Sequence, residues 1–169
     1  IVDDASKDRS KDVIKTLIDV KAFFHEKNQG KGKAVITGLK HATGDIVLIQ
    51  DADLEYSPED YPKLIAPIVE GYADVVYGSR FFGSAPHRVF NFHHYLANRS
   101  ITFFSNIFTN LNLSDVEVGY KVFTKDVVEK IISKLSSSRF GIEIELTARI
   151  ARLKIRIYEV TSSYKGRDY

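Results

Sequence analysis

A short apolar run that ends in acidic residues constrains this chain more than any other feature. Residues 46–49, Ile-Val-Leu-Ile, are consecutive apolar residues, which predicts a strand buried on both faces. Asp51, Asp53 and Glu55 follow it. Because alternate residues of an extended chain point the same way, we expect these three carboxylates to converge. Such oxygen ligands suit Mg²⁺ or Mn²⁺. A solvated acidic turn is the alternative, since Asp is common in turns.

The composition limits the classes of protein to consider. The chain has 169 residues, enough for one domain with a real core. A formal charge of +2 is too small to argue for a nucleic-acid partner. The absence of cysteine excludes a disulfide framework and a thiolate zinc site. No apolar run approaches the roughly 20 residues that span a bilayer.

The chain alternates predicted strands and helices with short connections, which indicates an α/β fold with a largely parallel sheet. The predicted elements are a helix over 10–20, a strand over 22–25, a helix from the loop 28–33 to 42, the strand 46–49, a helix over 57–70, a strand over 74–78, a helix over 92–111, a strand over 115–123, helices over 124–132 and 140–153, and a strand over 155–160. Ligands of such sheets lie outside the carboxyl ends of the strands. Four polar residues fall at that edge: Asp4, Asp51, Asp53 and Arg80.

Two further segments have two readings each. The loop 28–33, Asn-Gln-Gly-Lys-Gly-Lys, opens a helix, so its backbone N–H groups and lysines predict an anion site; a flexible solvated turn fits equally. The helix 92–111 carries apolar residues, many of them Phe, on one side and polar residues on the other. Packing against the core is the favoured reading of its apolar side, and a membrane-facing helix is the alternative.

The two ends of the chain give one prediction each, about a missing strand and about a mobile tail. Residues 1–2, Ile-Val, resemble the end of a buried strand. We therefore expect 1–169 to be one domain that lacks its first strand and helix, which leaves an unfinished sheet edge. The last residues, Tyr164 to Arg167, are basic and predicted to be mobile.

Several motifs, in this order, resemble glycosyltransferase family 2, and within it the dolichyl-phosphate mannose and glucose synthases and their bacterial polyprenyl-phosphate relatives. The motifs are those at 2–6 (VDDAS), 28–32 (NQGKG), 42–45 (ATGD), 50–54 (QDADL), 74–80 (DVVYGSR) and 119–123 (GYKVF). The resemblance implies a GT-A fold, a Rossmann-like single domain with a mixed, mainly parallel central sheet flanked by helices. It implies an inverting, metal-dependent transfer of a hexose from a nucleotide-sugar such as GDP-mannose or UDP-glucose to a polyprenyl or dolichyl phosphate. It also implies a peripheral position on a membrane surface, at its cytoplasmic face.

The chain departs from the family at its front. The family's opening strand, which helps to hold the base, is missing, and so are the transmembrane helices that some relatives carry after the catalytic domain. The missing strand puts nucleotide binding by these 169 residues in question.

The resemblance also implies roles for the residues that hold the donor. Asp4 is expected near the nucleoside, and Asp51 near the ribose and the metal ion. Asp53 is expected to be the principal ligand of Mg²⁺ or Mn²⁺, with Glu55 as a third contributor. Lys31 is expected to hold the donor, with an ordinary solvated lysine as the alternative.

Arginines are the candidates for phosphate recognition, because a guanidinium matches phosphate bidentately. Arg80, Arg88 and Arg99 are expected to bind the acceptor phosphate. Arg167 is expected to cover the diphosphate as a lid when the tail orders, and a disordered end is the alternative.

Asp115 falls where the family places an acidic residue near the reacting centre, and Glu117 is expected only to shape that site. The acceptor is a phosphate monoester with a second pKa of about 6, so little proton remains to be removed at neutral pH. Asp115 is therefore predicted to position an arginine or the sugar, or to stabilise positive charge, rather than to act as a general base.

Two rival functions share the features seen so far. A nucleotidyltransferase has the same kind of sheet and metal but releases pyrophosphate, whereas a glycosyltransferase releases a nucleoside diphosphate. A non-catalytic nucleotide-sugar-binding module is the second rival, and the presence of Asp51, Asp53 and Arg80 argues against it.

Overall fold

The computed structural model describes residues 1–83, 89 and 91–166. Its elements in order are β1 (Val2–Asp3), α1 (Ser10–Thr16), β2 (Phe23–Phe24), α2 (Lys31–His41), β3 (Ile46–Ile49), the 3₁₀-helix η1 (Pro58–Asp60), α3 (Tyr61–Val69), β4 (Val75–Ser79), α4 (Phe92–Thr109), β5 (Lys121–Thr124), α5 (Lys125–Ile131), the 3₁₀-helix η2 (Ile132–Lys134), α6 (Ile142–Ala151) and β6 (Ile157–Thr161).

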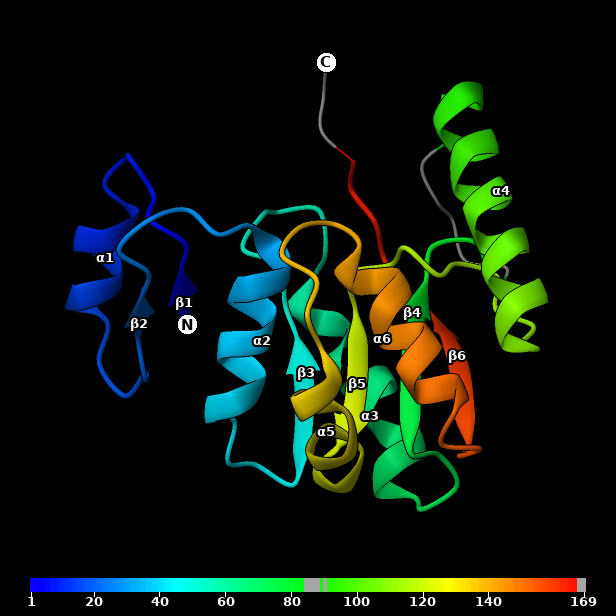
Figure 1. Cartoon of the computed structure of the whole chain (residues 1–169). Coiled ribbons are helices and arrows are strands. Elements are labelled where there is room, and N and C mark those ends of the chain that lie inside the picture. Colours follow the sequence, from blue (N-terminus) through cyan, green and yellow to red (C-terminus); the bar gives the residue numbers. More distant parts are fainter. Residues whose placement is uncertain (84–88, 90, 167–169) are drawn as a thin grey trace.

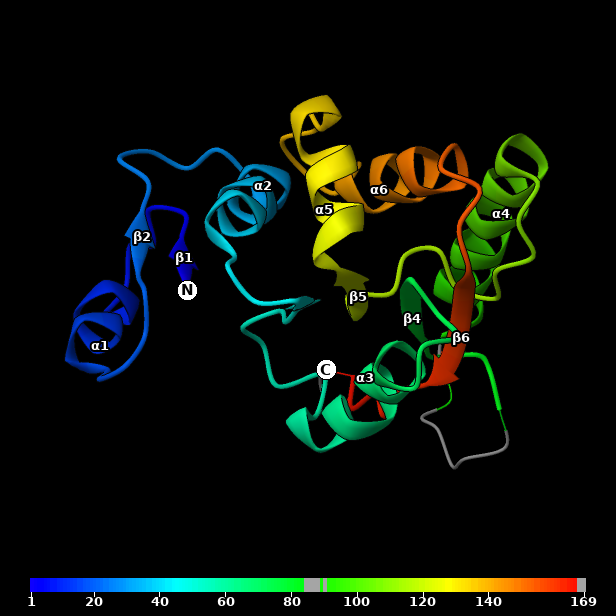
Figure 2. The same ribbon diagram turned by 90° about the horizontal axis from the view of Figure 1, so that it is seen from below.

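The central sheet has four strands in the order β3-β5-β4-β6. β5 runs antiparallel to both of its neighbours, and β4 pairs with β6 in parallel. β3, β4 and β6 therefore point the same way, and the sheet is mixed with mainly parallel strand directions. Helices α2, α5 and α6 lie on one side of it and α3 on the other (Figures 1 and 2). The predicted α/β class is confirmed.

The core lies around the two middle strands. Val75, Val76 and Tyr77 of β4 and Val122 and Phe123 of β5 are fully buried, as expected for β-branched and aromatic residues between two layers of helices. All four residues of β3 are only half-buried. The prediction that β3 is buried on both faces is wrong, because β3 forms the edge of this sheet.

The first 24 residues form a separate small unit. β1 and β2 pair in parallel as a second, two-stranded sheet, which lies beside α2 and apart from the main sheet in Figures 1 and 2. α1 ends at Thr16, earlier than the predicted 20, and none of its residues is buried. The backbone becomes extended at Leu17 and takes a positive φ of 62° at Asp19, so the predicted apolar face does not continue.

Two other predicted elements are shorter than expected. In place of the strand predicted over 115–123, β5 begins only at Lys121, because a turn at residues 116–117 and a bend at 119 precede it. The helix predicted over 57–70 begins with η1, where the Ser57 hydroxyl accepts the Glu59 N–H at 3.4 Å, and continues as α3.

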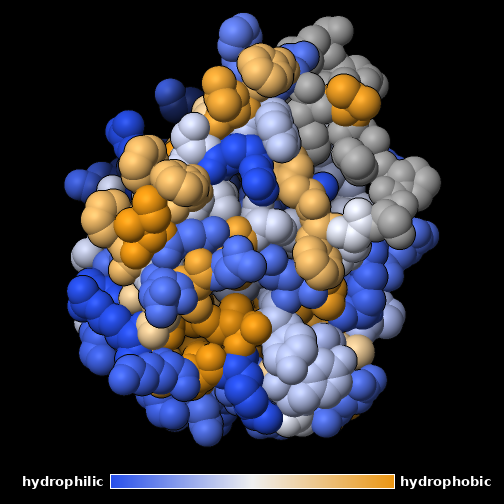
Figure 3. Space-filling model, turned by 90° about the vertical axis from the view of Figure 1, so that its right-hand side faces the viewer, coloured by the Kyte–Doolittle hydropathy of each residue, from blue (hydrophilic) through white to orange (hydrophobic). Residues whose placement is uncertain are grey.

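Helix α4 turns its polar side toward the body of the protein, whereas the favoured prediction placed its apolar side against the core. Thr102 and Ser105 are its buried residues, and α4 packs against α6. Six large apolar side chains of this helix are at least half exposed: Phe92, Leu96, Phe103, Phe104, Ile107 and Phe108. Figure 3 faces this side of the molecule and shows hydrophobic patches among hydrophilic ones. The apolar side is therefore not part of the core. None of the helices in the described ranges is long and apolar enough to cross a membrane.

Candidate active site

A pocket of about 450 Å³ opens where the strands of the main sheet end. Its walls come from the start of α2, the loop after β3, the end of β4, the turns before β5 and the start of α6. The lining residues are Lys31, Asp51, Ala52, Asp53, Glu55, Tyr56, Arg80, Glu117, Gly119, Phe140 and Glu143. The pocket thus brings together five predicted site residues and Glu117, which was expected to shape the site. The five are Lys31, Asp51, Asp53, Glu55 and Arg80.

Four charged side chains of alternating sign lead from the core to this pocket, and we call them the four-charge chain: Lys121, Glu143, Lys31 and Asp51. The Lys31 ammonium lies 2.8 Å from Asp51 Oδ2 and 3.0 Å from Glu143 Oε1. The other oxygen of Glu143 accepts from Lys121, whose Nζ also donates to the Val118 carbonyl. Burial alone would lower the pKa of Lys31, but the charges of Glu143 and Asp51 outweigh it and raise that pKa. Lys31 therefore stays protonated.

The two ends of this chain differ in exposure. The Lys121 side chain is fully buried and that of Glu143 is 7% exposed, whereas the side chains of Lys31 and Asp51 are each 24% exposed. A buried charge must keep its partner, while an exposed one can exchange its partner for a ligand. The Lys31–Asp51 end is thus the part that a ligand can reach.

A glycine lets the turn before β5 approach Asp51 closely. A Cβ atom at Gly119 would lie 2.4 Å from Asp51 Oδ2. The Gly119 N–H donates to the Tyr56 hydroxyl at 3.1 Å, and burial raises the pKa of that phenol. Tyr56 therefore stays neutral and fixes the turn beside Asp51.

The three carboxylates predicted as metal ligands do not form a metal cluster. Asp51, Asp53 and Glu55 line the same pocket, but no group of three potential ligands stands together within the described residues. The loop after β3 bends, so the alternation of an extended strand is lost: Asp53 Oδ1 accepts the Glu55 N–H at 3.2 Å. The Glu55 carboxylate accepts from the Tyr164 hydroxyl at 3.2 Å. The donor set still fits Mg²⁺ or Mn²⁺, because Mg²⁺ often takes only one or two carboxylates besides substrate phosphates.

Asp4 lies against the loop that precedes α2. Its carboxylate accepts the N–H groups of Gln29 and Gly30, at 2.9 and 2.6 Å, and it is 2.6 Å from His25 Nδ1. Asp4 is not among the described residues that line the pocket. The loop N–H groups predicted to bind an anion are therefore occupied by Asp4, which fixes the loop that presents Lys31.

Arg80 and Asp115 form a closed ion pair, which we call the Arg80–Asp115 pair. Arg80 Nε donates to Asp115 Oδ2 at 2.7 Å and Nη2 to Oδ1 at 2.8 Å. Asp115 is fully buried and the Arg80 side chain is 11% exposed. Although burial alone would lower it, the hydrogen bonds and charge of Asp115 raise the pKa of the Arg80 guanidinium. Arg80 also donates to Asn98 of α4 at 3.2 Å, so the pair connects the pocket to that helix.

The other predicted arginines fall outside the pocket lining or outside the described residues. Arg99 is exposed on α4 and donates to the Ser114 carbonyl at 3.3 Å, one residue from Asp115. Arg88 and Arg167 lie outside the described residues. Residues just before Arg167 are held rather than mobile, since the Lys165 N–H donates to the Glu55 carbonyl at 2.8 Å and Tyr56 and Tyr164 form a β-bridge.

Sequence reasoning missed three residues of the site. They are Glu143 of α6, Lys121 of β5 and Tyr56 of the loop after β3. The one signal was a lysine in an otherwise apolar strand, Lys-Val-Phe, because a buried lysine needs a partner. Burial also raises the pKa of Glu117 in the same pocket.

The sequence is similar to known glycosyltransferases over most of its length. The model of glycosyl transferase family 2 matches residues 1–132. The chain is 28% identical to a UDP-N-acetylglucosamine–dolichyl-phosphate N-acetylglucosaminyltransferase of Methanococcus voltae, over 95% of this chain and 71% of that protein. It is also 28% identical to an undecaprenyl-phosphate mannosyltransferase of Micrococcus luteus, over 99% of this chain and 72% of that protein.

The fold is similar to that of a solved enzyme. Glucosyl-3-phosphoglycerate synthase from Mycobacterium tuberculosis, in complex with Mn²⁺, UDP-glucose and phosphoglyceric acid, superposes with a TM-score of 0.67 and 18% identity. The match covers 99% of this chain and 60% of that one. At this identity the likeness shows the fold, which is the GT-A fold predicted from the sequence.

Proposed function

Since the chain belongs to glycosyl transferase family 2, we propose that it is the catalytic part of an enzyme that transfers a sugar from a nucleotide-sugar to a polyprenyl or dolichyl phosphate. The names of the two relatives support this acceptor class. The two names specify different sugars, N-acetylglucosamine and mannose. We therefore propose only that the donor is a nucleotide-sugar, of either the UDP or the GDP type. The chain spans about seven tenths of these relatives.

The observation that carries the proposal is the pocket's division into two charged parts. Asp51 and Asp53 supply oxygen ligands beside the Lys31 ammonium. Arg80 supplies a guanidinium on another wall, next to α4. A diphosphate with a divalent cation matches the first part, and a phosphate monoester matches the second.

In this mechanism Asp51 and Asp53 would hold a Mg²⁺ or Mn²⁺ ion, which would supply positive charge to neutralise the nucleoside diphosphate. Lys31 leaves Asp51 and donates to the diphosphate while Glu143 keeps its ammonium within the pocket. Arg80 orients the acceptor phosphate for attack on the sugar carbon. Asp115 holds Arg80 in place and takes no proton, because the acceptor is already mostly dianionic at neutral pH.

The exposed apolar side of α4 is suited to a membrane surface. Its phenylalanines lie on the same helix as Asn98, which contacts Arg80, and as Arg99. Phenylalanine on one face with basic residues nearby is typical of helices that lie at the lipid headgroup boundary. A lipid acceptor would then present its phosphate beside Arg80 without leaving the bilayer, and the enzyme would act as a peripheral protein at the cytoplasmic face.

The test of the reaction is an assay of products with a panel of nucleotide-sugars, Mn²⁺ and polyprenyl phosphate. We expect release of a nucleoside diphosphate and formation of a polyprenyl-phosphate sugar. Asp53→Ala should lose most turnover while the fold survives, and Glu129→Ala, an exposed acidic residue of α5, is the matched control. Release of pyrophosphate, or full turnover in excess chelator, would contradict the proposal.

The test of the membrane surface is flotation with vesicles of phosphatidylcholine and phosphatidylglycerol. Phe103→Ser and Phe108→Ser should each reduce the bound fraction. Val69→Ser, at an exposed apolar residue of α3, should leave it unchanged. Equal flotation of all three variants would exclude α4 as the contact.

A further inference from the structure

The segment 115–119 reaches both charged parts of the pocket. At one end, Asp115 holds Arg80 through two hydrogen bonds of 2.7 and 2.8 Å. At the other end, Gly119 approaches the donor part so closely that a Cβ atom there would lie 2.4 Å from Asp51 Oδ2. In the proposed reaction the transferred sugar connects the diphosphate on the donor part with the acceptor phosphate beside Arg80. The sugar must therefore lie across the middle of this segment.

Glu117 is the middle residue of the segment, and it lines the pocket. Its neighbours Val116 and Val118 are fully buried. The Val116 N–H donates to the Thr102 hydroxyl at 3.2 Å, and the Val118 carbonyl accepts from Lys121 Nζ. The backbone is thus held on both sides of Glu117, so its carboxylate is positioned before a ligand arrives.

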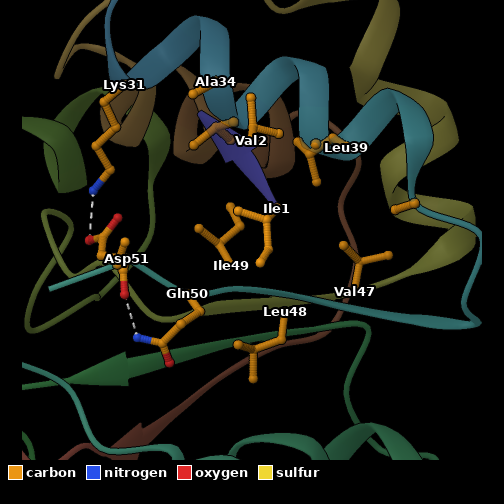
Figure 4. A pocket seen from close by; sticks show the side chains of 14 residues that line it. Ile1, Val2, Lys31, Ala34, Leu39, Val47, Leu48, Ile49, Gln50 and Asp51 are labelled. Atoms are coloured by element: carbon orange, nitrogen blue, oxygen red, sulfur yellow. Dashed lines mark hydrogen bonds and ion pairs between the residues drawn. The ribbon is translucent and has the colours of Figure 1, made fainter. Parts of the chain in front are cut away.

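Glu117 differs from the other carboxylates of the pocket in its hydrogen bonds. Each of the others accepts at least one hydrogen bond within the protein: Asp51, Asp53, Glu55 and Glu143. Figure 4 shows the bond from Lys31 to Asp51. Glu117 is half-buried and accepts none from the residues that the structure describes, and burial raises its pKa. Because a desolvated polar group without a partner is destabilising, a ligand with hydrogen-bond donors would satisfy it.

The charges around Glu117 limit which ligands fit there. The positive charges that act on it belong to Arg80 and Lys121, and each of these is already bonded to another carboxylate. The negative charges of Asp115 and Glu143 act on it as well. An ionised carboxylate can only accept hydrogen bonds, so hydroxyl and amide groups of a sugar suit it. A carboxylate on the sugar would be repelled over several ångströms in this half-buried place.

We propose that Glu117 selects neutral sugars: its carboxylate accepts a hydrogen bond from the transferred sugar and repels donors whose sugar carries a carboxylate. The inference rests on the proposed function and adds the substrate class to it. Nucleotide-hexoses and nucleotide-N-acetylhexosamines are accepted, whereas nucleotide-hexuronic acids are rejected. Such selection by repulsion is a common source of specificity. It gives Glu117 a role beyond the shaping of the site that the sequence predicted.

The experiment compares matched donors by titration calorimetry at pH 8 with Mn²⁺. UDP-glucose and UDP-glucuronic acid differ only in a hydroxymethyl group that is replaced by a carboxylate, and so do GDP-mannose and GDP-mannuronic acid. UDP and GDP without a sugar are the references. In the pair whose nucleoside diphosphate binds, we expect the neutral donor to bind about tenfold or more tightly than the acidic one, which corresponds to about 1.4 kcal/mol.

Glu117→Gln keeps the shape of the side chain without its charge and should remove most of this difference, while the affinity for UDP or GDP stays the same. Glu117→Ser removes the charge with a smaller side chain and should give the same result. Glu129→Gln is the matched control, because it removes the same charge at an exposed residue of α5. The ratio of the two affinities should not change in this variant.

Three results would overturn the inference alone. The unsubstituted chain could bind both members of the pair equally, or both Glu117 variants could keep the full difference. Glu117→Gln could also lose affinity for sugar-free UDP or GDP, which would assign Glu117 to the diphosphate or the metal ion. If the unsubstituted chain binds neither nucleotides nor nucleotide-sugars, the proposed function itself fails and the inference fails with it.

Discussion

The four-charge chain and the Arg80–Asp115 pair both reach the same pocket, yet they are built differently. Both oxygens of Asp115 are held by one guanidinium, and Asp115 is fully buried. In the four-charge chain each inner charge is shared by two partners, and burial decreases from Lys121 to Asp51. The pair is closed, whereas the chain has an accessible end.

This difference separates a charge that can exchange its partner for a ligand, Lys31, from a charge that would keep its own carboxylate while it contacts a ligand, Arg80. A closed pair loses much of its attraction if either partner turns away. Lys31 can leave Asp51 and remain bonded to Glu143, so the change costs only part of its interaction. Substitutions should therefore affect stability most at Lys121 and least at Lys31, with the opposite order for the binding of the donor.

The largest effect on stability is expected for Lys121→Met, because it leaves the Glu143 carboxylate buried with one partner fewer. We expect a loss of about 3–5 kcal/mol in the free energy of unfolding, measured by urea denaturation. The double variant Lys121→Met/Glu143→Gln should recover part of the loss, since no unpaired charge remains. If the two substitutions instead add without coupling, the pairing of these residues contributes nothing.

The next effect is expected for Asp115→Asn, which weakens both hydrogen bonds to Arg80. We expect the free energy of unfolding to fall by roughly 2–3 kcal/mol, in the range of charge-assisted hydrogen bonds. The KM for the lipid acceptor should rise more than the KM for the nucleotide-sugar. The profile of kcat against pH should keep its shape. Loss of an acid limb in the Asn variant alone would mean that Asp115 takes a proton after all.

Lys31→Met should change stability by no more than about 1 kcal/mol, because this lysine is partly exposed. The KM for the nucleotide-sugar should rise about tenfold, which corresponds to about 1.4 kcal/mol. Lys33→Met, on the same turn of α2, is the matched control. Equal effects of the two substitutions would remove the special role of Lys31.

A carboxylate outside both groups provides a reference for acid sensitivity. Burial alone would raise its pKa, but N–H groups of Ser136 and Ser137 lower the pKa of Glu145 to about 2. Because the pKa of Glu145 in the folded protein lies below its ordinary value of 4.5, its contribution to the free energy of unfolding is full above pH 4.5 and is lost as the pH falls toward 2. Glu145→Gln should cost roughly 1 kcal/mol at pH 7 and flatten the acid limb of stability without changing catalysis. If the loss of stability at acid pH is the same in Glu145→Gln as in the unsubstituted protein, other carboxylates cause the acid sensitivity.

The sequence predicted the strands and the common edge of the site well, because β-branched runs and their acidic ends are local signals. It failed where a pattern has two readings. The stripe of phenylalanine in α4 shows which side is apolar, but only the packing of Thr102 and Ser105 against the body shows that this side is uncovered. Likewise, nothing local links Lys121 to Glu143, or turns Asp4 toward the N–H groups of Gln29 and Gly30.

The position of β5 has a consequence for how the chain is made. β5 separates β3 from β4 in the sheet, although both precede it in the sequence. During synthesis β3 and β4 therefore leave the ribosome with no central strand to join them, until residues 121–124 follow. Contacts between such distant segments slow folding, and unpaired edges invite aggregation in the interval. The nascent chain is most exposed to this hazard before β5 is complete.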